Sequence, residues 1–248
     1  MTHTKKKILL ESEEITKTIG TLRDRINKRL PKSGLIERCD QLYAISSDAG
    51  NKVQKITQPI SHLVYLRWAL FILIAITLIT SIYLVFFGEF TVFTIIFSPD
   101  YADAEISLVL LLAGPFIYLW DLEKRKKQKL SLDALHEIRV IAHIIDMHQL
   151  TKDPNREYWV NKGELEQRET LNPFEMGRYL DYCSEMLALA GKVSAIYIQE
   201  SKDPVVISAA NEIEVLTTGL SRKIWQKLMV MHESKIGMAD SQAHQSNG

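Results

Sequence analysis

Hydrophobic residues gather in two long runs in the middle of the chain. The first run, from Leu66 to Phe87, contains a single charged residue, Arg67. As a helix rising about 1.5 Å per residue it covers roughly 33 Å, enough to cross a hydrocarbon layer of about 30 Å. The second run, from Ile106 to Trp120, covers about 22 Å and needs flanking residues or a thinner bilayer to cross. The pattern predicts a two-helix transmembrane hairpin, and the alternative is a pair of buried core helices in a soluble protein.

The distribution of Lys and Arg predicts how such a hairpin lies in the membrane. Basic residues flank its outer ends, above all between Lys124 and Lys129, whereas the connecting turn, residues 88–105, contains none. Because basic residues stay on the cytoplasmic side, both termini are expected to be cytoplasmic and the turn external. The first run begins too late for a cleaved signal peptide, so we expect insertion and not secretion. The charged residues of the turn are all acidic and form a candidate pore mouth: Glu89, Asp100, Asp103 and Glu105.

Before the hairpin, apolar residues recur three and four positions apart, which predicts amphipathic helices. Residues 5–30 carry such a stripe, read either as a short self-association seam or as one helix packing on its own domain, and Pro31 ends it. A second helix is expected to open at Ser33, with interruptions at Gly50 and Pro59.

After the hairpin, three start signals predict further helices. Ser131 is a candidate cap for a helix reaching Leu150, and the pairs Asn172-Pro173 and Asp203-Pro204 are typical of helix starts. No strand pattern competes, so the predicted fold is all-α. It comprises a cytoplasmic helical region (1–64), the transmembrane hairpin (65–120), a cytoplasmic helical bundle (121–234) and a disordered tail (235–248).

The formal net charge of the chain is zero, but its two ends differ. Residues 1–64 hold 12 Lys and Arg against 7 Asp and Glu, whereas residues 131–248 hold 12 against 17. The two parts either attract each other or neighbouring copies, or they present ordinary solvated helix faces. The two cysteines, Cys39 and Cys183, predict neither a disulfide framework nor a zinc cluster.

The strongest candidate for chemistry is a histidine face on the helix that begins at Ser131. His136, His143 and Asp146 project to one side, and their ligand types suit zinc or iron. The two histidines lie about 10 Å apart along the helix, too far to share one ion without another helix. They are therefore weak metal-site candidates, and the alternative is a polar packing or partner-contact face.

Other catalytic patterns are missing from the sequence. Arg139 and His143 are separated by three residues, which misses the Arg-to-His spacing of the helical RNases found among bacterial toxins. There is no phosphate-binding Gly-rich loop, no GxSxG and no CxxC. The absence of Asp, Glu, His and Lys at mid-membrane depth argues against a proton-coupled transporter. We therefore predict no catalytic residue, no cofactor and no enzymatic activity.

The order of the segments, with membrane helices at Leu66–Phe87 and Ile106–Trp120 between helical cytoplasmic parts, resembles a family of bacterial antiphage effectors. These are the two-transmembrane effectors encoded beside retron reverse transcriptases, and those of some cyclic-nucleotide defence systems look similar. The resemblance implies a multi-pass toxin of the bacterial inner membrane. A cytosolic partner would hold it inactive, and release would permeabilise the membrane. For a retron system, the implied partner is the reverse transcriptase with its RNA–DNA hybrid.

A single hairpin without mid-membrane charge is not expected to conduct alone, so the active toxin would be a homo-oligomer in the lipid bilayer. The alternative function is a non-toxic membrane anchor or scaffold that docks a cytosolic partner through the histidine-bearing face. A membrane enzyme is the third reading.

Overall fold

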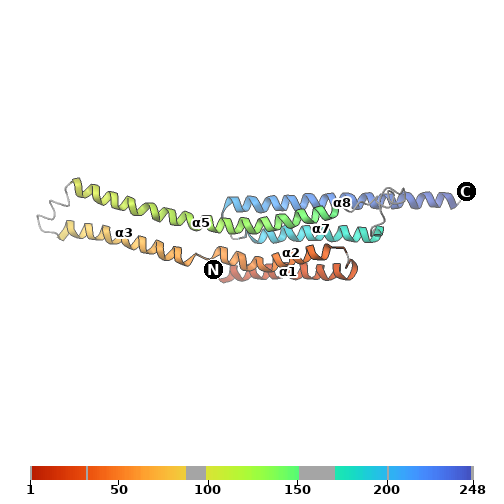
Figure 1. Cartoon of the computed structure of the whole chain (residues 1–248), viewed down its shortest axis with the longest axis horizontal. Coiled ribbons are helices and arrows are strands. Elements are labelled where there is room, and N and C mark those ends of the chain that lie inside the picture. Colours follow the sequence, from red (N-terminus) through yellow and green to blue (C-terminus); the bar gives the residue numbers. More distant parts are fainter. Residues whose placement is uncertain (1, 32, 88–98, 151–170, 200, 247–248) are drawn as a thin grey trace. The chain divides into compact units, whose positions relative to one another are not determined.

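In a computed structural model, residues 2–31, 33–87, 99–150, 171–199 and 201–246 are described, and they form α-helices without any strand (Figure 1). The prediction of an all-α chain is confirmed for these residues. Two of the helices are long and apolar enough to cross a membrane. The helices are α1 (Thr2–Arg29), α2 (Leu35–Thr57), α3 (Ser61–Phe87), α5 (Pro99–Leu150), α7 (Pro173–Ile196) and α8 (Pro204–Ser246).

The chain divides into two compact units. Unit 1 comprises Met1–Lys55 together with Ser131–Gly248, and unit 2 comprises Ile56–Leu130. The amino-terminal helices therefore share a unit with the carboxy-terminal ones, whereas the sequence placed residues 1–64 and 121–234 in separate regions. The reason is that the apolar stripe of α1 is buried, and α1 packs against α7.

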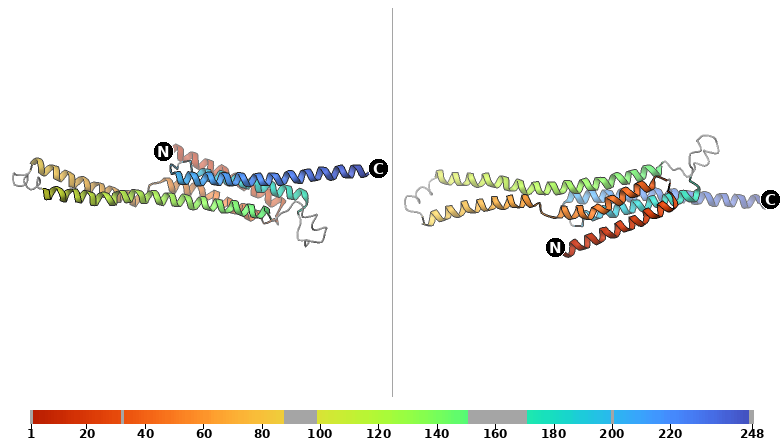
Figure 2. Two further views of the ribbon diagram at one scale, coloured as in Figure 1. Left: turned by 90° about the horizontal axis from the view of Figure 1, so that it is seen from above. Right: turned by 60° about the horizontal axis from the view of Figure 1, so that its bottom comes forward.

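The core of unit 1 is built from the apolar stripes of its helices, which run side by side (Figure 2). Ile19 and Ile26 of α1 are fully buried, and so is Leu180 of α7. α1 and α2 approach closely, because a Cβ on Gly20 would lie 3.3 Å from the ring of Tyr43. From Ile19 to Leu30 the stripe expected over residues 5–30 thus packs within the chain, which agrees with one of the two readings that the sequence left open.

Ion pairs link segments that are far apart in sequence within unit 1. Arg25 of α1 donates to both carboxylate oxygens of Glu185 on α7, at 3.0 and 2.8 Å. Lys52 of α2 lies 2.8 Å from Glu137 of α5. The basic amino-terminal part and the acidic carboxy-terminal part therefore contact each other within one chain. Exposed ion pairs of this kind contribute about 0–1 kcal/mol each to the free energy of folding. Burial of apolar side chains therefore supplies most of the stability, and the ion pairs help to orient the helices.

The expected helix starts after the hairpin are confirmed at two of three positions. Asn172 caps α7: its side chain accepts the backbone N–H groups of Phe174 and Glu175, while Glu175 accepts the N–H of Asn172 in a capping box. At α8, the Asp203 carboxylate accepts the N–H of Val205 at 2.9 Å. Ser131 does not start a helix, because it lies in the interior of α5, where it is buried. The polar residues before it are good helix formers, so nothing ends the helix there.

Three further boundaries differ from expectation. Gly50 lies within α2 and is buried, so it does not interrupt that helix, whereas Pro59 does lie between α2 and α3. The turn expected over residues 88–105 gives way to helix at Pro99. α8 continues to Ser246, although disorder was expected over residues 235–248. The residues from 235 to 246 include no proline, and polarity alone does not end a helix.

Candidate functional site

The described side chains of unit 2 expose a wide apolar surface. On α3, Phe71 and Ile79 are 54% and 65% exposed, and on α5 Leu110 and Ile117 are 68% and 67% exposed. Only 6% of the first apolar stretch is buried, and none of the second. Core helices of a soluble protein would be mostly buried, so the alternative of a buried pair does not fit. A large exposed apolar area of this kind marks a membrane or protein contact surface.

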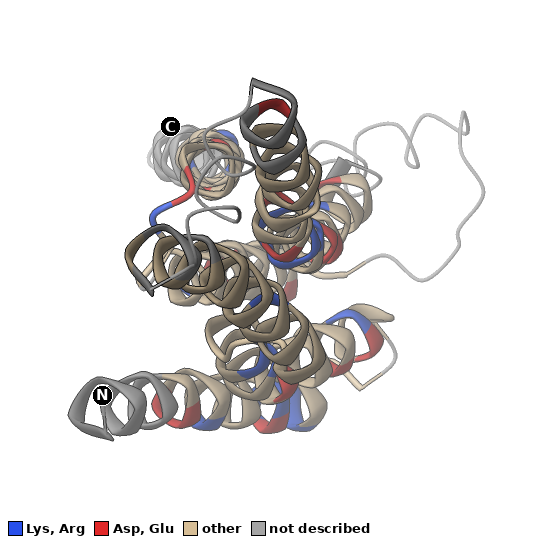
Figure 3. Cartoon of the chain, turned by 90° about the vertical axis from the view of Figure 1, so that its left-hand side faces the viewer, with Lys and Arg blue, Asp and Glu red and all other residues tan. Residues whose placement is uncertain are grey.

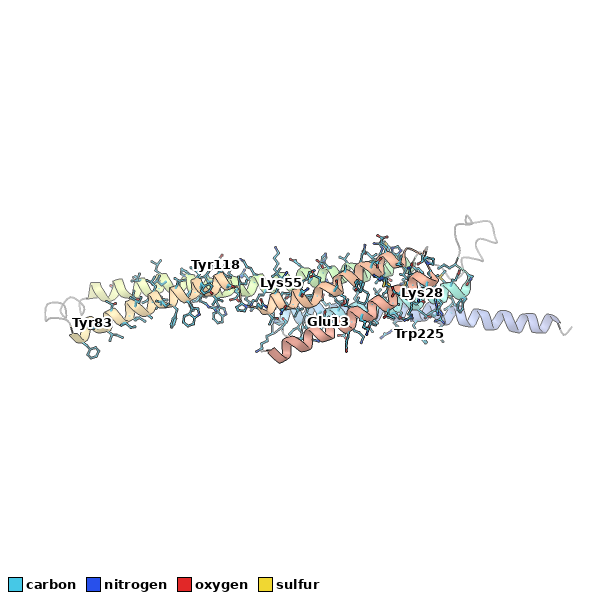
Figure 4. The ribbon with its side chains drawn as sticks, turned by 90° about the horizontal axis from the view of Figure 1, so that it is seen from below. Glu13, Lys28, Lys55, Tyr83, Tyr118 and Trp225 are labelled. Atoms are coloured by element: carbon cyan, nitrogen blue, oxygen red, sulfur yellow. The ribbon has the colours of Figure 1, made fainter. Side chains whose placement is uncertain are left out.

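Two threonine hydroxyls inside the apolar stretch of α3 are hydrogen-bonded within their own helix. The hydroxyl of Thr77 donates to the carbonyl of Ile74, and that of Thr80 donates to the carbonyl of Ile76, both at 2.8 Å. From Ala69 to Phe87 and from Ile106 to Trp120 the sequence contains no Lys, Arg, Asp or Glu, and the described residues of these stretches are drawn in tan in Figure 3. Figure 4 shows Tyr83 projecting from α3, where it is 60% exposed. At these two positions α3 can therefore contact hydrocarbon without leaving a threonine hydroxyl unbonded.

A polar cluster lies at the end of unit 2 that carries the basic residues. The Glu123 carboxylate contacts Lys127 at 3.0 Å and Arg67 at 3.5 Å, and it accepts the backbone N–H of Ile60 at 3.4 Å. The Arg67 guanidinium also stacks over the Trp120 ring, 4.6 Å from its centroid. Glu123 is only 12% exposed. Burial by itself would raise the pKa of this carboxyl, but Lys127, the Ile60 N–H and Arg67 together hold the pKa below its ordinary value.

Beside this cluster, residues of α3 and α5 line a hollow of about 170 Å³ that is open to the surface. Its lining consists of Arg67, Trp68, Phe71 and Phe116. Trp68 and Phe71 meet edge to face, with ring centroids 5.8 Å apart. The hollow is therefore aromatic in its walls and has one cationic group at its rim.

The candidate pore mouth is only partly described. Glu89 lies outside the described residues. Asp100, Asp103 and Glu105 lie on the first turns of α5, and the side chain of Asp103 is exposed. These three acids are thus on a helix and not in the expected turn, because Pro99 starts the helix earlier than the apolar run suggested.

The histidine face is present on α5 but gathers no further ligands. His136 and His143 are exposed, and Asp146 accepts a hydrogen bond from the Gln149 amide at 2.5 Å. Among the described residues, no group of three or more His, Cys, Asp or Glu side chains is arranged to hold a metal. Arg139, on the neighbouring turn, pairs with Glu212 of α8 at 2.6 Å. In the described part of the chain, no other helix therefore places metal ligands near these histidines.

Comparison with models of known protein families, with curated proteins and with solved structures gave no match. The argument for function therefore depends on unit 2, where the apolar surface, the Glu123 cluster and the hollow occur together. Of these, the Glu123 cluster was missed at the level of sequence. The available signal was an acidic residue, Glu123, directly before the basic cluster that follows the second apolar run, together with Arg67, the one charge of the first run.

Proposed function

We propose that this protein is a membrane-disrupting effector of a bacterial antiphage defence system. In this proposal α3 and residues 106–120 of α5 form a hairpin across the inner membrane, with both termini in the cytoplasm. A cytosolic partner, such as a reverse transcriptase with its RNA–DNA hybrid, holds the protein inactive, and release permeabilises the membrane. The observation that carries the proposal is the exposed apolar surface of α3 and α5, whose stretches from Ala69 to Phe87 and from Ile106 to Trp120 contain no charged residue.

The energetics of α3 support membrane insertion. Between Ala69 and Phe87 the sequence has thirteen Leu, Ile, Phe and Val residues and no charge. Each contributes about 0.3–0.6 kcal/mol to insertion when placed near the centre of a bilayer. The run therefore favours the membrane by at most about 4–8 kcal/mol, whereas in water the same side chains would remain exposed.

Permeabilisation requires more than one copy in this mechanism. The Thr77 and Thr80 hydroxyls are bonded within α3, and the sequence places no Lys, Arg, His, Asp or Glu at mid-depth of either span, so one hairpin offers little polar path for water or ions. Several hairpins side by side would place a ring of acids at the outer mouth. These acids are Glu89, Asp100, Asp103 and Glu105.

A non-toxic anchor or scaffold is the second candidate, and a particular surface favours it. Val140 and Met147 on α5 are 42% and 58% exposed, and they lie on the same side as His136 and His143. An exposed face that mixes apolar groups and histidines suits a protein partner. In this case the chain would hold that partner at the membrane without damaging it.

Topology is the first test. A reporter fused at Asp100 is expected to read as periplasmic, and reporters at both termini are expected to read as cytoplasmic, because of the Lys and Arg asymmetry. A periplasmic carboxy terminus would refute the hairpin and the effector proposal together.

The second test measures growth and membrane potential. Expressed without its neighbouring genes, the protein is expected to depolarise the membrane, and the complete locus is expected to suppress this effect. Combining Leu110→Arg with Leu112→Arg should abolish toxicity, since each charge costs about 2.5–3.5 kcal/mol at mid-span. The matched control adds the same two charges at exposed positions of α8, Val215→Arg with Val230→Arg, and should remain toxic.

Two further variants separate the mechanisms. Replacing His136 and His143 by Ala should leave the membrane step intact, although control by the partner is expected to weaken. Toxicity that persists without the hairpin but vanishes with the two histidines would assign the activity to unit 1 and favour an enzyme. If the acids line the mouth, leakage should favour cations, and neutralising all four should reduce that preference.

A further inference from the structure

A group of basic side chains follows the hollow of unit 2 along α5, and the topology argument uses them only as markers of the cytoplasmic side. Lys124, Lys126 and Lys129 are exposed on α5, and none of them forms an ion pair among the residues that the structure describes. Phe116, in the wall of the hollow, precedes Lys124 by eight residues, which corresponds to about 12 Å along a helix. An apolar hollow and a basic surface are thus separated by roughly two helical turns.

The charges around the hollow do not cancel. Glu123 compensates one of its two basic neighbours, Arg67 and Lys127, and leaves one positive charge between them. Arg125 is balanced by Asp121 at 2.6 Å. The three exposed lysines add three more positive charges, so this end of unit 2 is strongly cationic. It therefore favours an anionic ligand.

The walls of the hollow indicate a ligand with a hydrocarbon part. The hollow has a volume of about 170 Å³ and is lined by Trp68, Phe71 and Phe116, with the Arg67 guanidinium as its polar group. A free phosphate would use the cationic end alone and leave the aromatic walls in water. An acyl chain would cover them.

We propose that unit 2 binds one anionic phospholipid, with part of an acyl chain in the hollow and the phosphate held by the net positive charge of this end of unit 2, to which Lys124, Lys126 and Lys129 contribute from different sides of α5. Trp68 and Trp120 are 58% and 60% exposed beside this site, which suits rings at the level of lipid headgroups. The inference rests on the membrane insertion of the proposed function and adds the identity of a specific lipid. Such a lipid would fix the end of the hairpin at which Arg67 and Glu123 meet.

Native mass spectrometry of the full chain tests this proposal. The protein is released from detergent micelles that contain equal amounts of phosphatidylglycerol and phosphatidylcholine. We expect one phosphatidylglycerol to be retained per chain, preferred over phosphatidylcholine by on the order of fivefold or more, as expected when even one additional basic residue acts on the headgroup. Glycerol 3-phosphate, which has the headgroup chemistry without acyl chains, should not be retained.

Matched variants separate a built site from general charge attraction. Replacing all three lysines by Gln should bring the two phospholipids to nearly equal retention. Removing the same charge from exposed lysines of unit 1 should leave the preference unchanged, and these are Lys192→Gln, Lys202→Gln and Lys223→Gln.

The hollow has its own pair of variants. Phe116→Trp fills the hollow and should reduce retention of both phospholipids several-fold, whereas Ile117→Trp, at a neighbouring position that is 67% exposed, should not. Phe71→Trp fills the hollow from α3 and serves as an independent variant if Phe116→Trp loses its helical circular dichroism.

Equal retention of both phospholipids by the parent chain would overturn the proposal. So would a preference that survives the three Lys→Gln substitutions, or retention unaffected by filling the hollow. Carbonate extraction of the same protein from membranes reports on insertion separately. A chain that is integrated but retains no phospholipid refutes only the lipid site, whereas a chain that is extracted refutes the proposed function as well.

Discussion

Removing the Ile26 side chain from α1 tests whether the two ends of the chain fold as one unit. Ile26 is fully buried in the core of unit 1, and α1 packs against α7 although about 150 residues separate them. If the two ends depend on each other, Ile26→Ala should destabilise α7 as well as α1. If the amino-terminal helices folded independently, the effect would instead be limited to α1 and α2.

The size of the effect follows from the burial of Ile26. The substitution removes three carbon atoms from water-free surroundings, and each buried CH₂ contributes about 0.8 kcal/mol. Adding a cavity term places the loss near 3 kcal/mol, within the range of about 2–5 kcal/mol for Ile→Ala in a core. Since about 1.4 kcal/mol corresponds to a factor of ten, the unfolded fraction of unit 1 should rise on the order of a hundredfold.

Amide hydrogen exchange measures this in the full-length protein. The slowest amides of α7, which exchange only when the whole unit opens, should exchange about a hundredfold faster in Ile26→Ala. The control is Lys28→Ala, an exposed position on the same helix (Figure 4), which should change exchange little. Faster exchange confined to α1 and α2, with α7 unchanged, would show that the two ends fold independently and would refute the reasoning.

Three further outcomes are expected. Asn172→Ala removes the cap of α7 and should lower the free energy of unfolding by about 1 kcal/mol, measured by thermal circular dichroism. Because the pKa of Glu123 is lower in the folded protein, its ionised carboxylate stabilises the fold at pH values above the ordinary carboxyl pKa of about 4.3. This contribution is lost as the pH falls through the lowered pKa. Glu123→Gln should therefore make the melting temperature depend less on pH in the acid range. Burial raises the pKa of the Cys39 and Cys183 thiols to about 12, so iodoacetamide at pH 8 should label them far more slowly in the folded protein than in denaturant; equal rates would contradict their burial.

The sequence by itself determined the features that depend on neighbouring residues. The two apolar runs, the start of α7 at Asn172 and the start of α8 at Asp203 all follow from side chains within a few positions of each other. A capping side chain bonds only to backbone groups of the next turn, and the spacing of apolar residues in a helix can be recognised within one segment. Pro59 was placed correctly between helices for the same reason.

The sequence predicted two helix boundaries that the structure does not have, at Ser131 and at Gly50. Ser131 has the chemistry of a cap, but α5 continues through it and buries it. Gly50 has a low helix propensity, but it is buried within α2, and packing outweighs a cost of about 1 kcal/mol. A capping residue or a glycine ends a helix only where the packing of the next residues does not favour its continuation.

Only the tertiary structure decided which faces meet. Arg67 and Glu123 are 56 positions apart, and nothing near either residue indicates that they pair. The same holds for the packing of α1 on α7 and for the absence of further metal ligands around His143 in the described part of unit 1. Each apolar stripe fits several partners about equally well, so the choice depends on the summed burial of all the helices, which no short segment contains.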